Sequence, residues 1–125
     1  MIVFFQLNIW AGALADGMLE QLGATKIRRV YRPKAHGVDQ MHRTQGTKAL
    51  GSCVLFSSVA GTFGSSAQGN YAAANACLDA FASCRGAQGR HAASVDWGPW
   101  AEVGMASGRV MNARMDAIGL GAIDR

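Results

Sequence analysis

The sequence CVLFSSVAGTFGSSAQGNYAAANA, residues Cys53–Ala76, decides the fold of this chain. It opens with four apolar residues, Cys53–Phe56, a run too short for a helix and typical of a strand buried on both faces. Two serines follow, and then a stretch of Gly, Ser, Thr and Gln that we interpret as an irregular loop. An alanine-rich helical run begins at Tyr71. The pattern therefore predicts a strand, a loop and a helix in that order.

Polar side chains gather where this strand should end and where the helix begins. Tyr71 and Asn75 are four residues apart, so a helix places them on one face, a turn apart. In parallel α/β folds, functional groups collect at the carboxyl ends of the strands. A serine there, with a tyrosine and an amide directed at the same point, can polarise a carbonyl group and protonate it. Ser57 and Ser58 both stand at that end of the strand, and a serine that only caps the strand is the structural alternative.

The patterns on either side predict further strands and helices in alternation, which is typical of a parallel sheet. The apolar N-terminus reads as a strand and not as a secretory signal, because it lacks basic residues and two polar residues interrupt it. The predicted elements are a strand over Ile2–Ile9, a short helix over Asp16–Leu22, a helix capped by Thr25, a helical stripe of Lys34, Val38, Met41 and Gln45, a helix over Gly69–Arg85, a strand over His91–Trp97 and a helix around Val110–Ile118. Pro33 either breaks the helix that Thr25 begins or opens the next one.

Composition narrows the class of protein. Half of the 125 residues are hydrophobic and 16% are charged, which favours one globular domain over a disordered chain. The net charge is +4, but the basic residues are scattered, so no nucleic-acid partner is expected. No apolar run is long enough to cross a membrane. Three cysteines without metal-ligand spacing read as reduced core residues of a cytoplasmic protein, and no metal site is expected.

Several ordered motifs resemble one family. Besides Cys53–Ala76, they are Ala11-Gly12-Ala13-Leu14-Ala15-Asp16-Gly17, Arg32-Pro33-Lys34-Ala35-His36-Gly37, and the stretch from Trp97-Gly98-Pro99 to Met105-Ala106. Together they resemble the catalytic part of polyketide synthase ketoreductase domains, a branch of the short-chain dehydrogenase/reductases. The resemblance covers roughly Trp10 to the end. It implies an α/β fold, a partial Rossmann-like parallel sheet with flanking helices, in which residues 1–125 form a single domain that is the C-terminal catalytic part of a ketoreductase.

The resemblance also implies catalytic roles. Most short-chain dehydrogenases carry a lysine four residues after the tyrosine, where this chain has Asn75. Polyketide ketoreductases interchange the lysine and the asparagine, and their lysine follows a proline, as Lys34 does here. By this likeness Lys34 is the cation that stabilises a phenolate, Ser58 binds the carbonyl oxygen, Tyr71 donates the proton and Asn75 completes the relay. An ordinary solvated lysine is the alternative for Lys34, with Lys26 and Lys48 as weaker claimants.

The same likeness implies an NADPH site and a substrate site. The substrate is expected to be a 3-oxoacyl group on an acyl carrier protein, reduced to the 3-hydroxyacyl form in polyketide or fatty-acid biosynthesis. The triplet Leu14-Ala15-Asp16 resembles the Leu-Asp-Asp fingerprint of ketoreductases that give the D product, with its middle residue changed. Phe63 stands where the opposite class carries tryptophan, which also points to D. The expected cofactor-binding residues are Lys34, Tyr71, Ala11, Gly12, Gly98 and Pro99, and the expected substrate-binding residues are Asp16, Phe63 and Met105.

One feature of the family has no counterpart here. A dinucleotide site begins with a strand, a Gly-x-Gly-x-x-Gly turn and a helix, and no segment of this sequence fits that pattern. We therefore expect the chain to correspond to the family's sheet from its fourth strand onward. The first strand would then be an apolar edge that either promotes aggregation or pairs with a missing partner, the N-terminal half or other synthase domains. Two other functions remain open: a catalytically inactive remnant that packs against a partner chain, and a small binding module unrelated to reduction.

Overall fold

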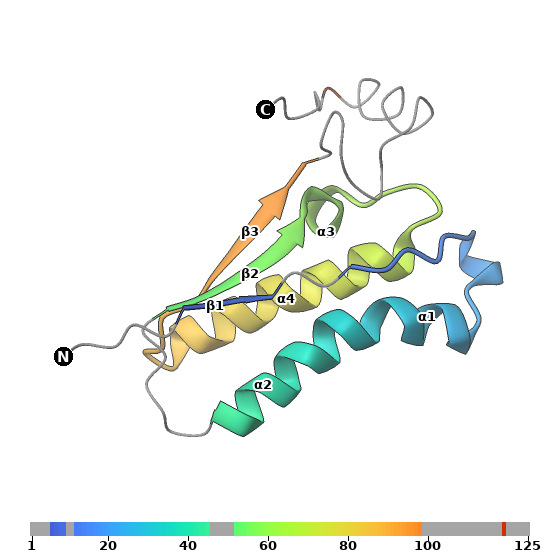
Figure 1. Ribbon diagram of the computed structural model, residues 1–125. Helices are drawn as coiled ribbons and strands as arrows, with labels where there is room; N and C mark the ends of the chain where they lie inside the picture. The colour runs from blue at the N-terminus through green and yellow to red at the C-terminus, as the bar shows by residue number, and fades with distance from the viewer. Residues whose placement is uncertain (1–5, 10–11, 46–51, 99–118, 120–125) are drawn as a thin grey trace.

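The described chain contains a three-stranded parallel sheet, with α1 (Ala24–Tyr31), α2 (Gly37–Gln45) and α4 (Gly69–Ala87) on one side of it (Figure 1). The computed structural model describes residues 6–9, 12–45, 52–98 and Gly119. The strands are β1 (Gln6–Ile9), β2 (Ser52–Ser58) and β3 (Ala93–Trp97), in the spatial order β1-β2-β3. Leu7 pairs with Cys53, and Phe56 pairs with Val95. Because the strands are parallel, their carboxyl ends share one edge of the sheet, where β2 ends at Ser58.

Helices pack against the sheet and against one another (Figure 1). The helices are η1 (Leu19–Gln21), α1 (Ala24–Tyr31), η2 (Arg32–His36), α2 (Gly37–Gln45), α3 (Val59–Phe63) and α4 (Gly69–Ala87). One long helical segment, made of α1, η2 and α2, runs alongside α4, and α4 packs against β2 and β3. The predicted helix over Gly69–Arg85 is thus confirmed, and it continues through Gly86 to Ala87.

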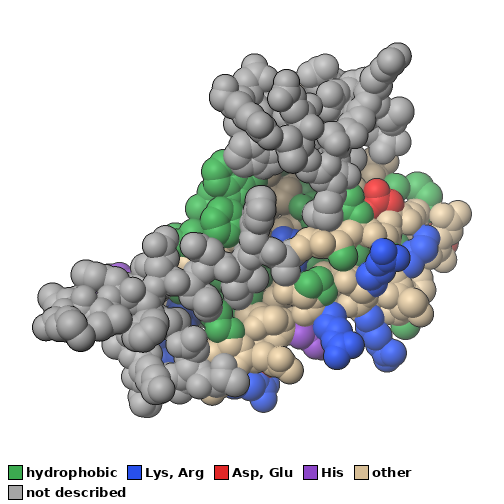
Figure 2. All heavy atoms as spheres, viewed as in Figure 1, with side chains coloured by type: hydrophobic (Ala, Val, Ile, Leu, Met, Phe, Trp, Pro, Cys, Tyr) green, Lys and Arg blue, Asp and Glu red, His purple; other side chains and the backbone are tan. Residues whose placement is uncertain are grey.

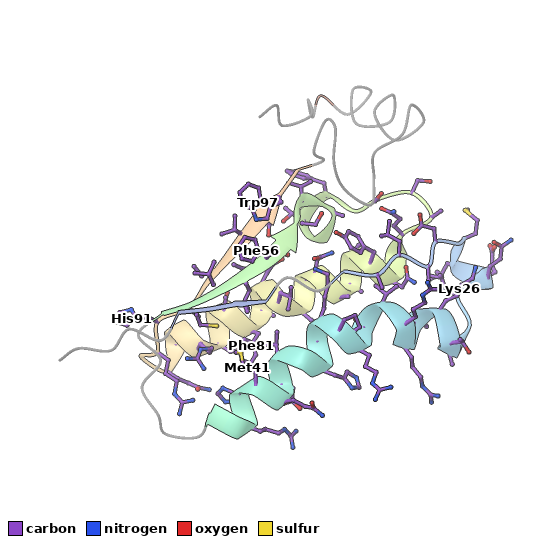
Figure 3. All side chains as sticks on the ribbon, viewed as in Figure 1. Lys26, Met41, Phe56, Phe81, His91 and Trp97 are labelled. Atoms are coloured by element: carbon purple, nitrogen blue, oxygen red, sulfur yellow. The ribbon has the colours of Figure 1, made fainter. Side chains whose placement is uncertain are left out.

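The core lies between the sheet and this helical layer. Cys53 and Leu55 on β2 pack with Val38 on α2 and with Leu78 and Ala82 on α4, and all five side chains are buried. The residues between them on β2, Val54 and Phe56, are half-buried. The strand is therefore fully buried on one face only, in contrast to the prediction that both faces are buried. On its other face Phe56 stacks with Trp97 of β3, with ring centroids 6.1 Å apart (Figure 3).

Three local predictions are wrong. Asp16–Leu22 contains only the short 3₁₀ helix η1, and two of its apolar side chains, Met18 and Leu19, are 55% and 82% exposed and so cover no core. The N-cap of α1 is Gly23 and not Thr25, which lies inside the helix. The loop predicted after β2 begins as the helix α3, because Ser58 caps it with its side chain.

Pro33 lies at the start of a new helical element, as one of the two alternatives predicted, and the chain stays helical on both sides of it. It lies within η2, a π-helical turn that continues α1 into α2. Proline has no N–H to donate, and a widened turn accommodates the lost hydrogen bond without ending the helix. The stripe predicted from Lys34 is confirmed at Lys34 and Val38, both of which are buried. The π-helical turn at Arg32–His36 was not predicted.

Cysteines and charges partly follow the predictions. All three cysteines are free thiols, but only Cys53 is buried; Cys77 is half-buried and Cys84 is exposed, so the expectation of three core cysteines is wrong. The Lys and Arg side chains visible in Figure 2 are spaced over the helical layer without forming one continuous patch in this view. No helix in the described parts of the chain is long and apolar enough to cross a membrane. The predicted segments at Ile2–Phe5 and Val110–Ile118 lie outside the described residues.

Candidate active site

The carboxyl end of β2 carries the first group of the candidate site. Ser58 has extended backbone angles, and its Oγ accepts a hydrogen bond from the Ala60 N–H at 3.3 Å, which makes it the N-cap of α3. Because Oγ is the acceptor in that bond, the Ser58 O–H remains a donor that a carbonyl oxygen can use. Ser58 can therefore cap α3 and still donate a hydrogen bond to a carbonyl group, so the structural and the catalytic interpretations of this serine are compatible.

Ser57 has a different task. Its side chain is buried, and its Oγ donates to the backbone carbonyl of Asn75 at 3.3 Å. This bond joins the end of β2 to the first half of α4. Ser57 is therefore committed to holding the helix against the strand, whereas Ser58 lies on the half-buried side.

The first half of α4 presents Tyr71 and Asn75. The Asn75 side chain is fully buried, and its Nδ2 donates to the Tyr71 carbonyl at 2.9 Å. Its Oδ1 has no hydrogen-bond partner among the described residues. A buried amide oxygen without a donor is costly, and such atoms mark places where a water or a ligand group fits. Tyr71 is half-buried one helical turn earlier.

Lys34 reaches this helix from η2. Its side chain is only 4% exposed, its Nζ donates to the Phe56 carbonyl at 3.2 Å, and the same Nζ lies 5.7 Å from the centroid of the Tyr71 ring. Burial lowers the pKa of the Lys34 ammonium from its ordinary value, and the carboxylate of Asp79 partly opposes that effect. The ammonium has three donor hydrogens, and the Phe56 carbonyl takes one. Two donors remain beside the aromatic ring.

The other lysines do not compete for this position within the described chain. Lys26 lies near η1, at the far end of the helical layer from Phe56 (Figure 3). Its Nζ donates to the Asp16 carbonyl at 3.0 Å. Lys48 lies outside the described residues. The structure therefore brings Lys34, Tyr71 and Asn75 together, next to the strand that ends at Ser58.

The segment around Asp16, an expected substrate-binding residue, is held by hydrogen bonds to the residues just before Tyr71. Asp16 accepts a hydrogen bond from Gln68 at 3.0 Å, and the Gly17 N–H donates to the Ala67 carbonyl at 2.8 Å. Asn70 donates to the Ala15 carbonyl at 3.0 Å. These bonds hold residues 15–17 against the turn that leads into α4. They also explain why this segment is not the predicted helix, since its polar groups bond across to the turn.

The remaining predicted residues are less closely tied to the cluster. Phe63, at the end of α3, is 70% exposed, and Gly12 is exposed. Gly98 is half-buried and directly follows β3. Ala11, Pro99 and Met105 lie outside the described residues, and so does Trp10. No group of three or more His, Cys, Asp or Glu side chains that could hold a metal occurs within the described ranges.

Sequence reasoning missed several polar residues around the cluster. Gln68 and Asn70 are each 4% exposed, although polar residues before a helix usually read as solvated loop. Asp79 was also missed. It follows Asn75 by one helical turn, and its Oδ1 accepts a hydrogen bond from Ser94 of β3 at 2.5 Å. The sequence does carry a signal for Asp79: it is a carboxylate one helical turn after Asn75, inside an otherwise apolar helix.

Comparisons with known proteins show what the chain is similar to. A family model described as the KR domain matches residues 9–102. The chain is 46% identical over 105 residues to the spectinabilin polyketide synthase system protein NorA′ of Streptomyces orinoci, covering 84% of this chain and 3% of that one. It is 44% identical over 117 residues to the polyketide synthase GfsB of Streptomyces halstedii, covering 91% of this chain and 2% of that one.

Solved structures show the same likeness. An A-type ketoreductase from a modular polyketide synthase matches with a TM-score of 0.88 and 36% identity, covering 96% of this chain and 26% of that chain. The first ketoreductase of the tylosin polyketide synthase matches with a TM-score of 0.80 and 42% identity, covering 93% of this chain and 26% of that chain. The sequence thus spans about a quarter of the solved chains and a few per cent of the curated synthases.

Proposed function

The chain belongs to the KR domain family, the ketoreductases of polyketide synthases within the short-chain dehydrogenase/reductases, and from that premise we propose that it provides the catalytic segment of an NADPH-dependent ketoreductase. The proposed substrate is a 3-oxoacyl thioester on an acyl carrier protein, and the product is the 3-hydroxyacyl thioester. One observation carries the proposal: the Lys34 ammonium is buried against the Tyr71 ring, one helical turn from a buried Asn75 amide.

The residues present fit the nicotinamide-ribose end of such a cofactor. Lys34 has two donors beyond its bond to the Phe56 carbonyl, and the Asn75 Oδ1 beside this site has no partner among the described residues. Lys34 and Tyr71 would hold the ribose hydroxyls, with Gly12 and Gly98 near the nicotinamide by family likeness. When bound, NADPH supplies the hydride that adds to the ketone carbon.

The chain's own residues handle the proton and the charge. Ketone reduction places negative charge on the carbonyl oxygen, so donors directed at that oxygen lower the barrier. Ser58 donates its O–H to the oxygen, and Tyr71 delivers the proton that completes the alcohol. Lys34 stabilises the phenolate that Tyr71 leaves, because an ammonium close to an aromatic ring favours the anion. Asn75 completes the proton relay, because its Oδ1 can accept a hydrogen bond from a donor in the site.

The configuration of the product is part of the same proposal. Asp16, fixed by Gln68, and Phe63 at the end of α3 are the residues on which the D configuration rests. Chiral chromatography of the 3-hydroxyacyl product tests this point. An L product would contradict it without touching the proposal of reduction.

The test uses two preparations. In the first, calorimetry measures NADPH binding to the 125-residue chain alone. In the second, the chain replaces the homologous segment of a ketoreductase domain, and NADPH oxidation is followed with a soluble 3-oxoacyl thioester. We expect turnover in the second preparation, its loss with Tyr71→Phe, and no change with Asp39→Asn, which alters an exposed ion pair with Arg43.

The outcomes separate the alternatives. A folded replacement domain that binds NADPH but does not oxidise it would favour the inactive remnant. A folded replacement domain that neither binds nor oxidises NADPH would favour a binding module unrelated to reduction. Turnover that survives Tyr71→Phe would contradict the assigned proton donor.

A further inference from the structure

The Lys34 ammonium presents an electrostatic problem. It is almost fully buried, and its hydrogen bond goes to a neutral carbonyl, that of Phe56. Among the described residues no carboxylate lies within ion-pair distance of the Lys34 ammonium. The ion pair that these residues do contain joins Asp39 and Arg43 at an exposed place on α2. A buried ammonium without a counter-charge tends to lose its proton. A neutral amine at this position would stabilise a phenolate poorly.

Asp79 supplies a negative charge from the same helix that carries Tyr71 and Asn75. The three residues follow one another at intervals of four, so they lie along one side of α4. Asp79 and Lys34 also bond to neighbouring positions of the sheet: Ser94, which donates to Asp79, pairs with Leu55, and the next residue of β2, Phe56, accepts the hydrogen bond from Lys34. The Asp79 carboxylate raises the pKa of Lys34, against the larger lowering by burial. The titratable side chains on the elements around η2 are Tyr71, Cys77, Asp79, Cys84 and Arg85 on α4, Lys26, Arg28, Arg29 and Tyr31 on α1, Asp39, His42 and Arg43 on α2, Cys53 on β2, and Arg32 and His36 on η2 itself.

The surrounding residues fix the Asp79 carboxylate in place. Ser94 on β3 donates to Oδ1 at 2.5 Å. On the α3 side the carboxylate lies against Gly61, where an added Cβ would stand 3.1 Å from Oδ2. A hydrogen bond donated to a carboxylate is shorter and stronger than one between neutral groups, so it holds the Asp79 side chain in place. The Asp79 side chain is thus anchored between β3 and α3, one helical turn after Asn75 on α4.

We propose that Asp79 is a positioning residue of this site: held by Ser94, it is the counter-charge that keeps Lys34 an ammonium ion. Asp79 touches neither substrate nor cofactor in this role. It acts through Lys34, whose remaining donors stay available to a phenolate and to ribose hydroxyls. The consequence for reduction rests on the proposed function, whereas the coupling between Asp79 and Lys34 does not.

Nuclear magnetic resonance can measure the coupling directly in the 125-residue chain. The Lys34 ¹⁵Nζ resonance, assigned by its loss in Lys34→Met, is followed as the pH is raised. In Asp79→Asn the amide keeps an oxygen for Ser94 but loses the charge, so the Lys34 titration midpoint should move to lower pH than in the wild type. Asp39→Asn makes the same chemical change at an exposed position on α2 and should leave the midpoint in place.

Ser94→Ala distinguishes a charge effect from a structural one. It removes the bond that anchors Asp79 but keeps the carboxylate, so its midpoint should fall between those of the wild type and Asp79→Asn. An unchanged midpoint in Asp79→Asn would overturn the proposal, and so would an equal displacement by Ser94→Ala. If Asp79→Asn does not fold, the ¹³Cγ resonance of Asp79 in the wild type gives the answer. It should inflect at the Lys34 midpoint, and a flat curve there would overturn the proposal.

Kinetics in the replacement domain separate this inference from the proposed function. With Asp79→Asn the alkaline fall in kcat/KM should begin at lower pH than in the wild type, and Asp79→Glu should restore part of the difference. A displaced Lys34 titration in a domain without reductase activity would uphold the coupling and contradict the proposed function. An alkaline limb that stays in place in an active domain would contradict the role of Asp79 in the reaction.

Discussion

Replacing Gly61 by alanine tests how closely α3 must approach α4. A Cβ added at Gly61 would lie 3.1 Å from the Ala76 backbone nitrogen, 3.1 Å from the Asp79 Oδ2 and 3.3 Å from the Asn75 Cβ. Real Cβ atoms rarely come so close, and a helix backbone cannot move aside as a flexible side chain can. The two helices must therefore separate slightly, and overpacking of this kind costs about 1–3 kcal/mol.

A matched substitution isolates this effect. Gly86 also lies in a helix, α4, but nothing comes within 4 Å of a Cβ added there. Alanine should stabilise the chain at Gly86 through helix propensity, by up to about 1 kcal/mol. The same gain applies in principle at Gly61, so the difference between the two variants measures the overpacking alone. We expect Gly61→Ala to be less stable than Gly86→Ala by about 1–3 kcal/mol.

Urea unfolding followed by circular dichroism measures both free energies, and the slopes should stay equal if only the native state changes. In thermal melts the difference corresponds to roughly 4–12 °C, because 1 kcal/mol shifts the Tm of a domain of this size by about 4 °C. If the two alanines stabilise the chain equally, the close approach of α3 to α4 is wrong. The attachment of Asp79 to this interface would then be wrong as well.

Three further predictions concern stability. Burial lowers the pKa of Lys34 below 10.5 in the folded chain, so the unfolded chain binds the Lys34 proton more tightly than the folded chain does. The free energy of unfolding of the wild type should therefore rise relative to that of Lys34→Met as the pH rises from the folded-state pKa of Lys34 to its unfolded-state pKa. Parallel stability curves for these two proteins would refute the assignment of Lys34 as buried. Ser58→Ala removes the cap of α3 and should lose about 0.5–2 kcal/mol in urea, while Ser58→Asn should lose less; equal losses would show that the cap is unimportant. Leu78→Ala empties a core position that is 1% exposed and should cost about 2–5 kcal/mol, whereas Leu19→Ala, at an 82% exposed position, should stay within about 0.5 kcal/mol of the wild type; comparable losses would contradict the core.

The elements that the sequence predicted well are those with strong internal patterns. The apolar run at Cys53–Phe56 became the centre of β2, and the alanine-rich run after Gly69 became α4, because a buried strand and a long apolar helix leave clear periodic signals. The stripe that contains Lys34 and Val38 faced the core for the same reason. These elements place the candidate site residues that the family motifs indicated.

The elements that it predicted poorly depend on contacts between distant segments. Helix α3 contains a glycine and a threonine, both poor helix formers, and it forms where Ser58 caps it and Gly61 packs on α4. The segment around Asp16 is held by Gln68, which no local pattern reveals. The π turn at Pro33 is a further example, since proline in a helical pattern usually signals an end.

The candidate site divides in the same way. The family resemblance grouped Lys34, Tyr71 and Asn75, whose proximity the structure shows through the contact of Lys34 with the Tyr71 ring and the hydrogen bond from Asn75 to the Tyr71 carbonyl. Of the residues that support them, Ser57 lies inside the Cys53–Ala76 motif but was considered only as a competitor of Ser58, and Asp79 lies outside the quoted motifs. Their partners are a backbone carbonyl on α4 and a hydroxyl on β3, and both contacts depend on the folded arrangement.

Deuterium transfer from the cofactor shows whether a ketone is reduced and whether Tyr71 is needed for that step. The domain that carries this chain would be supplied with NADPH deuterated at the transferred position and with a 3-oxoacyl thioester, and mass spectrometry would examine the product. We predict a 3-hydroxyacyl thioester with one deuterium on carbon 3, formed by the wild type and lost in Tyr71→Phe. A folded domain that leaves the ketone unreduced, or a Tyr71→Phe variant that forms the deuterated alcohol at the wild-type rate, would contradict the account.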